Sequence, residues 1–195
     1  MSLRPDLAII AEHVAKGARV LDIGCGDGEL MAELRDRREV DARGLELDAR
    51  NVSLAVARGL SVIQGDADKD LAYYPDRAFD YAILSQTLQT ARAPDKVLAE
   101  LLRIGDRAFV SFPNFAFWKV RWALFWGGRM PVTAALPISW YETENIHQLT
   151  IDDFRALLNE RGITVEGAWF LSGDQRTSAT MANLLAEHAV FLLKR

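Results

Sequence analysis

Apolar positions along the first 113 residues follow two alternating patterns. Short apolar runs without helical spacing predict five strands, at Arg19–Ile23, Asp41–Leu47, Leu60–Gln64, Phe79–Leu84 and Arg107–Phe112. Between them, apolar residues three and four positions apart predict helices at Glu29–Arg38, Ala49–Arg58 and Asp95–Ile104. Strands that alternate with helices predict crossover connections and a parallel sheet covered by helices on both faces.

The pattern changes in the second half of the chain. Aromatic residues with helical spacing predict a helix over Asn114–Trp126, and an irregular stretch then extends to residue 149. Thr150 and Asp153 have the spacing of a capping box, so a further helix is expected after Thr150. Two final apolar runs, Ile163–Leu171 and Glu187–Lys194, predict an antiparallel pair of strands.

Together these elements predict one domain over residues 1–195. We expect a mostly parallel, seven-stranded sheet with helices on both faces and an antiparallel C-terminal strand at one edge. The segment 113–149 does not follow the alternating pattern, and we expect it to form a lid or a partner-contact insertion.

Composition narrows the classes of function. The chain carries 23 Lys and Arg against 27 Asp and Glu, and its net charge of −4 argues against a nucleic-acid-binding surface. The most apolar stretch, Ala108–Trp126, contains Pro113, Lys119 and Arg121, so it does not predict a membrane span. The first residues lack the pattern of a secretion signal. Cys25 is the only cysteine, which excludes an internal disulfide and argues against cysteine-ligated zinc. We expect a cytoplasmic protein without a metal site.

The first predicted strand turns into the first predicted helix through three glycines. Gly24, Gly26 and Gly28 permit a tight turn and let a ligand approach the main chain closely. The helix that follows presents backbone N–H groups and a positive end to such a ligand. A dinucleotide-binding turn would need glycine at the position of Glu29. Asp22, near the end of the strand, would repel a pyrophosphate but attract an amino-acid ammonium.

An acidic residue stands near the end of the second predicted strand. Glu46 lies eighteen positions after Gly28, where the second strand ends beside the first, and its carboxylate can accept both hydroxyls of a ribose. The alternatives are a solvated acidic residue before a turn, or ribose binding by Asp48. Cys25, inside the glycine turn, is either a thiolate favoured by the helix N-terminus or a small side chain that fits a crowded turn.

These residues resemble motif I and the following motifs of the class I S-adenosylmethionine (SAM) methyltransferases. Within that superfamily, nearly the whole chain resembles the MetW family of methionine biosynthesis proteins. The segments that carry this resemblance are Leu21-Asp-Ile-Gly-Cys-Gly-Asp-Gly28, Gly44-Leu-Glu-Leu-Asp48, Gln64-Gly-Asp66, Phe79-Asp-Tyr-Ala-Ile-Leu-Ser-Gln-Thr-Leu-Gln89, Phe112-Pro-Asn-Phe115, Trp140-Tyr-Glu-Thr-Glu-Asn-Ile-His147 and Asn183-Leu-Leu-Ala186.

The resemblance implies a Rossmann-like class I methyltransferase fold and binding of SAM or S-adenosylhomocysteine (SAH). It also implies a role in methionine biosynthesis together with a homoserine O-acyltransferase of the MetX type, but it implies no methyl acceptor. Asp66 would bind the adenine amino group beside the backbone of Ala67, although Asp66 also suits an Asx turn. The predicted cofactor-binding set is Asp22, Gly24, Cys25, Gly26, Gly28, Glu46, Leu47, Asp66, Ala67 and Ser85.

Catalytic residues are less clearly indicated. Methyl transfer needs alignment and sometimes a base, but neither a metal nor a covalent intermediate. The weak candidates are Gln86 and His147, and a lone histidine before a helix is also typical of a structural hydrogen bond. Phe112-Pro-Asn-Phe115 differs from the Asn/Asp-Pro-Pro-aromatic motif of enzymes that methylate amines on DNA and protein, which argues against a nucleobase amine as substrate.

Two hypotheses about function follow. The first is a SAM- or SAH-binding accessory or regulatory partner of the acyltransferase. It is favoured by the complete ligand motifs and by the aromatic residues from Phe115 to Trp126, which suit either a lid or a partner surface. The second is a SAM-dependent methyltransferase acting on a small metabolite. A nicotinamide-dependent dehydrogenase is disfavoured because Glu29 breaks the glycine spacing that it requires.

Overall fold

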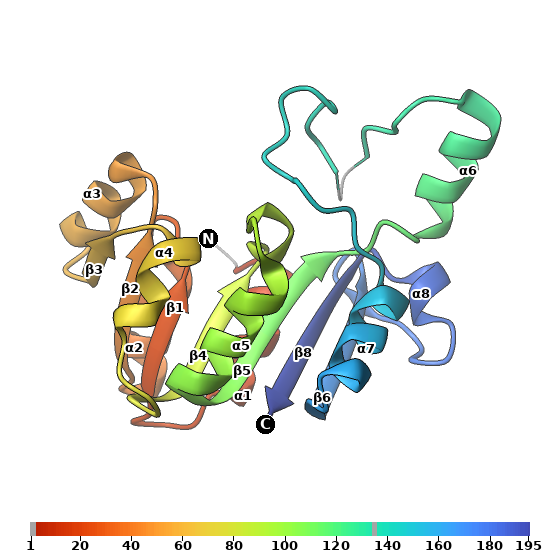
Figure 1. Ribbon diagram of the computed structural model, residues 1–195. Helices are drawn as coiled ribbons and strands as arrows, with labels where there is room; N and C mark the ends of the chain where they lie inside the picture. Colours follow the sequence, from red (N-terminus) through yellow and green to blue (C-terminus); the bar gives the residue numbers. More distant parts are fainter. Residues whose placement is uncertain (1–2, 134–135) are drawn as a thin grey trace.

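A twisted sheet with the strand order β3-β2-β1-β4-β5-β8-β6-β7 forms the centre of the computed structural model, which describes residues 3–133 and 136–195 (Figure 1). The pairs β1–β2, β1–β4, β2–β3 and β4–β5 are all parallel, as the sequence predicts. The eight strands of the described residues are β1 Arg19–Ile23, β2 Asp41–Glu46, β3 Ser61–Gln64, β4 Phe79–Ser85, β5 Gly105–Pro113, β6 Thr164–Ser172, β7 Gln175–Arg176 and β8 His188–Lys194.

The C-terminal strand differs from the prediction in its position. β8 is antiparallel to its neighbours, as expected, but it lies between β5 and β6 rather than at the sheet edge. The edge is formed instead by β7, a two-residue strand that the sequence analysis did not predict. The apolar run Ala189–Leu193 explains the interior position, because a strand with neighbours on both sides and helices above and below is mostly buried.

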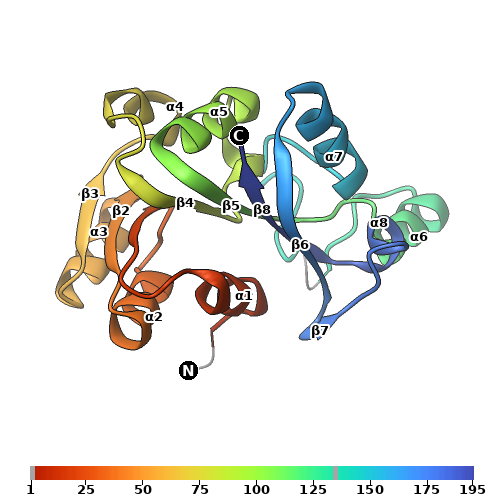
Figure 2. The same ribbon diagram turned by 90° about the horizontal axis from the view of Figure 1, so that it is seen from below.

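Helices cover both faces of the sheet, with α1 and α2 on one side and α5 and α7 on the other (Figure 2). α1 was not predicted, although Pro5 at its first turn and Asp6 are typical of a helix start. The helices are α1 Pro5–His13, α2 Glu29–Arg38, α3 Ala49–Ala57, α4 Ala67–Asp70, α5 Pro94–Ile104, α6 Trp118–Gly127, α7 Ile151–Glu160 and α8 Ala182–Leu185, with 3-10 turns η1 Leu71–Tyr73 and η2 Leu88–Thr90.

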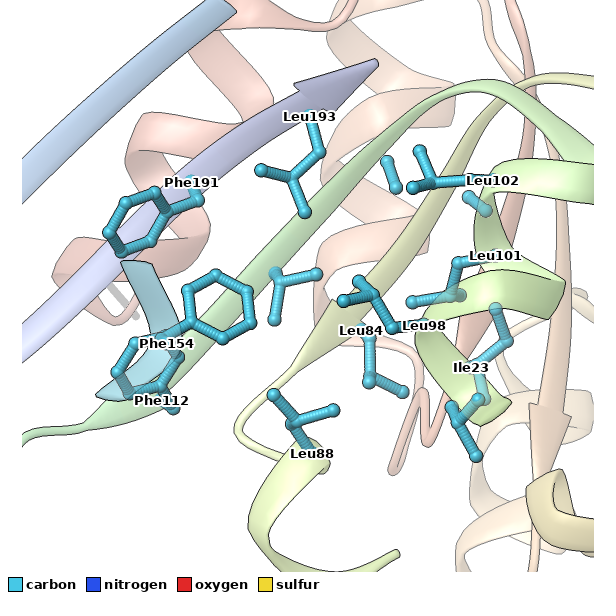
Figure 3. Close-up of a cluster of buried hydrophobic side chains, with 14 of the residues drawn as sticks. Ile23, Leu84, Leu88, Leu98, Leu101, Leu102, Phe112, Phe154, Phe191 and Leu193 are labelled. Carbon is cyan, nitrogen blue, oxygen red and sulfur yellow. The ribbon is translucent and has the colours of Figure 1, made fainter. Parts of the chain in front are cut away.

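The larger hydrophobic core lies between the sheet and the helices α5 and α7 (Figure 3). Phe112, Phe154 and Phe191 pack there with ring centroids 4.8–5.9 Å apart, in stacked and edge-to-face arrangements that aromatic rings prefer. The predicted capping box is confirmed at the start of α7, where the Thr150 side chain accepts a hydrogen bond from the backbone of Asp153. These contacts hold α7 against the sheet.

The segment between β5 and α7 departs from the body of the fold. α6 begins at Trp118, four residues later than predicted, and Asn114 lies outside the helix. The Asn114 amide donates to the carbonyl oxygens of Asn183 and Ala186 at 3.1 and 2.8 Å, which fixes the chain leaving β5 against the C-terminal region. α6 then extends away from the sheet (Figure 1). In the described part of the chain, no helix is long and apolar enough to cross a membrane.

Candidate functional site

A cavity of about 480 Å³ opens where the central parallel strands end. Ligands bind at this edge of parallel α/β sheets because the loops that follow the strands form a crevice there. The predicted residues that line the cavity are Gly24, Gly26, Glu46, Leu47, Asp66, Ala67, Ser85 and Gln86. Asp22, Cys25, Gly28 and His147 do not line it, so the structure brings together most, but not all, of the predicted set.

The glycine turn between β1 and α2 has two different surroundings. Gly26 has φ +57°, and a Cβ added there would meet nothing within 4 Å. Gly28 has φ +80°, and a Cβ there would lie 2.3 Å from Leu60 Cδ1. Both positive φ values favour glycine, and the surroundings of the two residues add a different requirement at each position. Gly26 keeps the cavity open, whereas Gly28 allows the turn to pack against the region before β3.

Glu46 connects the glycine turn to β2. Its carboxylate is 8% exposed and accepts hydrogen bonds from the backbone N–H of Gly26 at 2.8 Å and of Asp48 at 2.9 Å. Each carboxylate oxygen keeps a second lone-pair site, so both can still accept from a ligand hydroxyl. Asp48, the alternative ribose ligand, instead caps α3 by accepting from Arg50 N at 2.6 Å. The cavity geometry therefore favours Glu46 over Asp48.

Asp66 forms the Asx-type turn that the sequence offered as an alternative to a ligand contact. Its side chain accepts from Asp68 N at 3.0 Å and pairs with Lys69 at 2.8 Å. These contacts lower the pKa of Asp66, the Lys69 hydrogen bond contributing most. Asp66 and Ala67 line the cavity, so the turn and a ligand contact are compatible, and the adenine contact remains a prediction.

Asp22 lies behind the cavity, near the end of β1. It is 2% exposed. Burial raises the pKa of Asp22 to about 7, with Arg4 opposing the increase and Glu46 adding to it. A buried carboxylate of this kind is stabilised when a cation approaches, because the cation favours its charged form.

Arg4 is a charged residue of the site that was not predicted from the sequence, as are Asp68 and Glu144. Its guanidinium lines the cavity and donates from Nη2 to Ser85 Oγ at 2.9 Å and to Asp6 Oδ2 at 3.2 Å. Asp6 is buried and also accepts from Ser111 Oγ at 2.8 Å. The Arg4 side chain remains 53% exposed, so it can still meet an anionic group. Pro5 and Asp6 are a local signal for α1, but they do not indicate that Arg4 contacts Ser85.

The two weak catalytic candidates occupy different places. Gln86 lines the cavity with φ +55°, and its Nε2 lies 3.0 Å from His188 Nδ1. His147 lines a separate recess with Leu88 and Phe154, so the structure does not support the hypothesis that it is a base near a ligand in this cavity. His147 Nε2 is buried without a hydrogen-bond partner among the described residues, so the structural hydrogen bond is not seen there either.

Cys25 faces the interior rather than the cavity. It packs against a cluster that includes Met31, Ala55 and Leu60. Burial raises the pKa of the Cys25 thiol, and the carboxylates of Asp22 and Glu46 raise it further. This environment disfavours the thiolate and favours the alternative of a small packed side chain. In residues 3–133 and 136–195, no three His, Cys, Asp or Glu side chains form a group that could hold a metal ion.

The sequence matches a known protein family over nearly its whole length. The sequence model of the family described as "Methionine biosynthesis protein MetW" matches residues 4–193. The chain is 34% identical over 184 residues to the bifunctional methionine biosynthesis protein MetXA/MetW of Rhodopirellula baltica, a match covering 90% of this chain and 30% of that protein. It is 31% identical over 121 residues to the magnesium-protoporphyrin O-methyltransferase of Rhodobacter capsulatus, covering 58% of this chain and 52% of the relative.

Several solved structures described as SAM-dependent methyltransferases have folds similar to this chain. A TehB-like enzyme from Corynebacterium glutamicum aligns with TM-score 0.66 and 19% identity, covering 100% of this chain and 89% of its own. An S-adenosylmethionine-dependent methyltransferase from Mesorhizobium loti aligns with TM-score 0.70 and 16% identity, covering 96% of both chains. At these identities the likeness shows the fold, and the predicted class I methyltransferase-like fold is confirmed.

Proposed function

This chain belongs to the MetW family of methionine biosynthesis proteins, and we propose that it binds SAM or SAH at the glycine turn and serves as an accessory partner of a MetX-type homoserine O-acyltransferase. The observation that carries the partnership is the Rhodopirellula baltica relative, whose name joins MetXA and MetW in one protein. This chain spans only 30% of that relative's length, so the partnership is a proposal for this chain.

The cavity suits an adenosyl amino acid in its charges and its size. Its volume of about 480 Å³ falls within the range of small-molecule sites. In the proposed complex, Asp22 stabilises the ligand ammonium, and Arg4 pairs with the ligand carboxylate. Glu46 accepts the ribose hydroxyls, while Asp66 and Ala67 contact the adenine. When bound, SAM supplies a sulfonium methyl group, whereas SAH supplies only the same recognition elements.

Replacement of Glu46 tests the proposed ribose contact. We expect Glu46→Ala to weaken SAH binding by about 1–3 kcal/mol, because it removes charge-assisted hydrogen bonds both to the ligand and to Gly26 N. Isothermal titration calorimetry at fixed pH measures the change. Asp48→Ala is the matched control, since it removes a neighbouring carboxylate that caps α3 without lining the cavity. Equal losses in the two variants would contradict the assignment of Glu46.

The proposed partner surface is the aromatic face of α6, which we define as Trp118, Trp122, Phe125 and Trp126. These side chains are 44–78% exposed on a helix that extends from the body of the fold (Figure 1). Large exposed apolar patches mark interaction sites, and tryptophan is enriched among the residues that contribute most to binding. Within the described residues of 113–149, we propose that α6 contacts the acyltransferase and that the part after α6 forms the lid.

The partnership is tested by purifying this chain together with the homoserine O-acyltransferase of the same organism. We expect the two proteins to associate and the rate of homoserine acylation to change when this chain is added, with a further change when SAH is present. No association together with an unchanged acylation rate would contradict the proposal.

The aromatic face of α6 is tested within the same system. We expect the double variant Trp122→Asp, Phe125→Asp to lower the affinity for the acyltransferase at least tenfold, because burying two introduced charges opposes association. SAH affinity and the melting temperature should not change, since both side chains are largely exposed. Tyr73→Asp, at an 84% exposed aromatic residue on η1, is the control and should associate normally. Loss of association in the control alone would place the interface elsewhere.

A methyltransferase acting on a small metabolite is the second candidate. It is favoured by a second cavity that adjoins the first and shares Gln86, Thr90 and Glu144 with it. Incubating the protein with methyl-labelled SAM and metabolite extracts would distinguish the two functions. Label transferred to a metabolite supports the enzyme, and label remaining wholly on SAM supports the accessory role.

A further inference from the structure

The second cavity, of about 300 Å³, lies beside the first at the end of β4 and β5. Its walls come from the β4 and β5 ends and from residues 130–131 and 136–148 of the segment after α6. Much of the wall is apolar, from Pro113, Phe115, Met130, Pro131, Leu136, Pro137, Ile138 and Trp140. Such a wall suits the apolar body of a small molecule, because concave sites of this size gain most of their affinity from apolar contact.

The charged groups at the second cavity are all acidic. Among the described residues that line it, the ionisable side chains near neutral pH are Glu142 and Glu144, and none is a lysine, arginine or histidine. Two carboxylates attract a cation and repel an anion, since like charges oppose binding while opposite charges favour it. The first cavity differs in this respect, because Arg4 lines it.

Gln89 gives the second cavity a specific requirement. Its side chain is 4% exposed, and its Nε2 donates to the Gln86 carbonyl oxygen at 2.7 Å. This bond fixes the orientation of the amide, so the other amide atom is an acceptor. Gln89 Oε1 is buried and has no hydrogen-bond partner within the described part of the chain. A buried acceptor without a partner is unfavourable, and a ligand donor that reached Oε1 would relieve this cost.

The backbone around Gln89 holds this arrangement in place. The Gln89 carbonyl oxygen accepts from the N–H groups of Ile146 and His147 at 2.9 and 3.0 Å. The η2 turn that carries Gln89 is thereby connected to the segment that forms the opposite wall. The free Oε1 therefore belongs to a constrained structure rather than to an exposed side chain that can turn to water.

We infer that the second cavity binds a small molecule with an apolar body and a hydrogen-bond donor. It prefers a primary amine to a hydroxyl as that donor, and it rejects carboxylates. The donor would meet Gln89 Oε1, and a positive charge on it would be favoured by Glu144. If methyl transfer occurs, this is the acceptor site; that role rests on the proposed adenosyl site, whereas the selectivity of the cavity is measured without it.

Three probes with one apolar body test the selectivity: 2-phenylethylamine, 2-phenylethanol and phenylacetate. Saturation-transfer NMR on the full chain should detect the amine most strongly, the alcohol more weakly and the acid not at all. Gln89→Leu should lower amine affinity at least fivefold. Gln175→Leu, the same change on the exposed strand β7, should leave it unaltered. Because Gln89 is buried, Trp140→Ala provides a second variant at a 73% exposed wall residue and should also weaken amine binding.

Titrating SAH into the same samples separates this inference from the proposed function. SAH binding with no amine binding, equal binding of amine and acid, or unchanged amine affinity in both Gln89→Leu and Trp140→Ala would overturn the second site. Selective amine binding without SAH binding would support the second site and overturn the adenosyl site.

Discussion

Gly26→Val is expected to abolish SAH binding while leaving the chain folded. A Cβ at Gly26 meets nothing within 4 Å, so the added isopropyl group extends into space at the cavity without a clash in the free protein. The left-handed φ of +57° costs a β-branched residue on the order of 1–2 kcal/mol, which lowers but does not eliminate stability. Calorimetric titration and a thermal melt measure the two effects separately.

Two other glycines serve as controls for Gly26. Gly173→Val, at φ +58° with open space around it, introduces the same backbone strain at a position that does not line the cavity and should bind SAH normally. Gly28→Ala should chiefly destabilise the fold, because its Cβ would lie 2.3 Å from Leu60 Cδ1. Unchanged SAH affinity in Gly26→Val, or an equal loss in Gly173→Val, would contradict the assignment of the glycine turn to the ligand.

Asp22→Asn is expected to stabilise the free protein at pH 8 and to weaken its binding of SAH. The unfolded chain ionises Asp22 near the ordinary pKa of 3.8, whereas the folded chain ionises it at about 7. The folded state therefore loses stability relative to the unfolded state as the pH rises from 3.8 to 7, by up to about 4 kcal/mol. A neutral amide avoids this cost, so the variant should gain on the order of 2–4 kcal/mol above pH 7.

The gain in Asp22→Asn should shrink as the pH falls and vanish below the ordinary pKa of 3.8, where Asp22 is protonated in both the folded and the unfolded chain. Denaturant unfolding at a series of pH values measures this difference. Asp36→Asn, at an exposed carboxylate whose pKa is lowered by the Arg35 hydrogen bond, should not show such a gain. A variant of Asp22 that is less stable than the parent at pH 8 would contradict the burial argument.

Ligand binding should depend on pH through the same carboxylate. In the proposed complex, an ammonium in the cavity in front of the buried Asp22 favours the charged form of this carboxylate. SAH affinity should therefore decrease as the pH falls from 7 to 5.5, because Asp22 must release a proton on binding. Titrations in buffers with different ionisation enthalpies count the protons released. Asp22→Asn should bind weakly at every pH in this range and release no proton from this position.

Local sequence patterns predict the part of the site that is formed by consecutive residues. The strand, glycine turn and helix from Arg19 to Arg38 are found with the predicted bounds of β1 and α2. Glu46 reaches Gly26 because neighbouring parallel strands end together, which the crossover pattern predicts. Cys25 shows the limit of this reasoning, because its thiol environment depends on what packs around the turn rather than on the turn itself.

Local sequence patterns do not predict residues that reach the site through tertiary packing. Arg4 reaches Ser85 across 81 sequence positions, and no local signal indicates that contact. β8 enters the sheet between β5 and β6, although its own pattern predicts only a buried strand. The sequence does not predict the unpartnered Gln89 Oε1, because the wall of the second cavity comes largely from the segment after α6, which is distant along the chain.

The most direct test of the account is equilibrium dialysis of labelled SAH against the purified chain, with Gly26→Val in parallel. We expect the parent to retain one SAH per chain in a saturable manner and the Gly26→Val variant to retain none. Retention by neither protein, or equal retention by both, would contradict the claim that the cavity at the glycine turn holds an adenosyl amino acid.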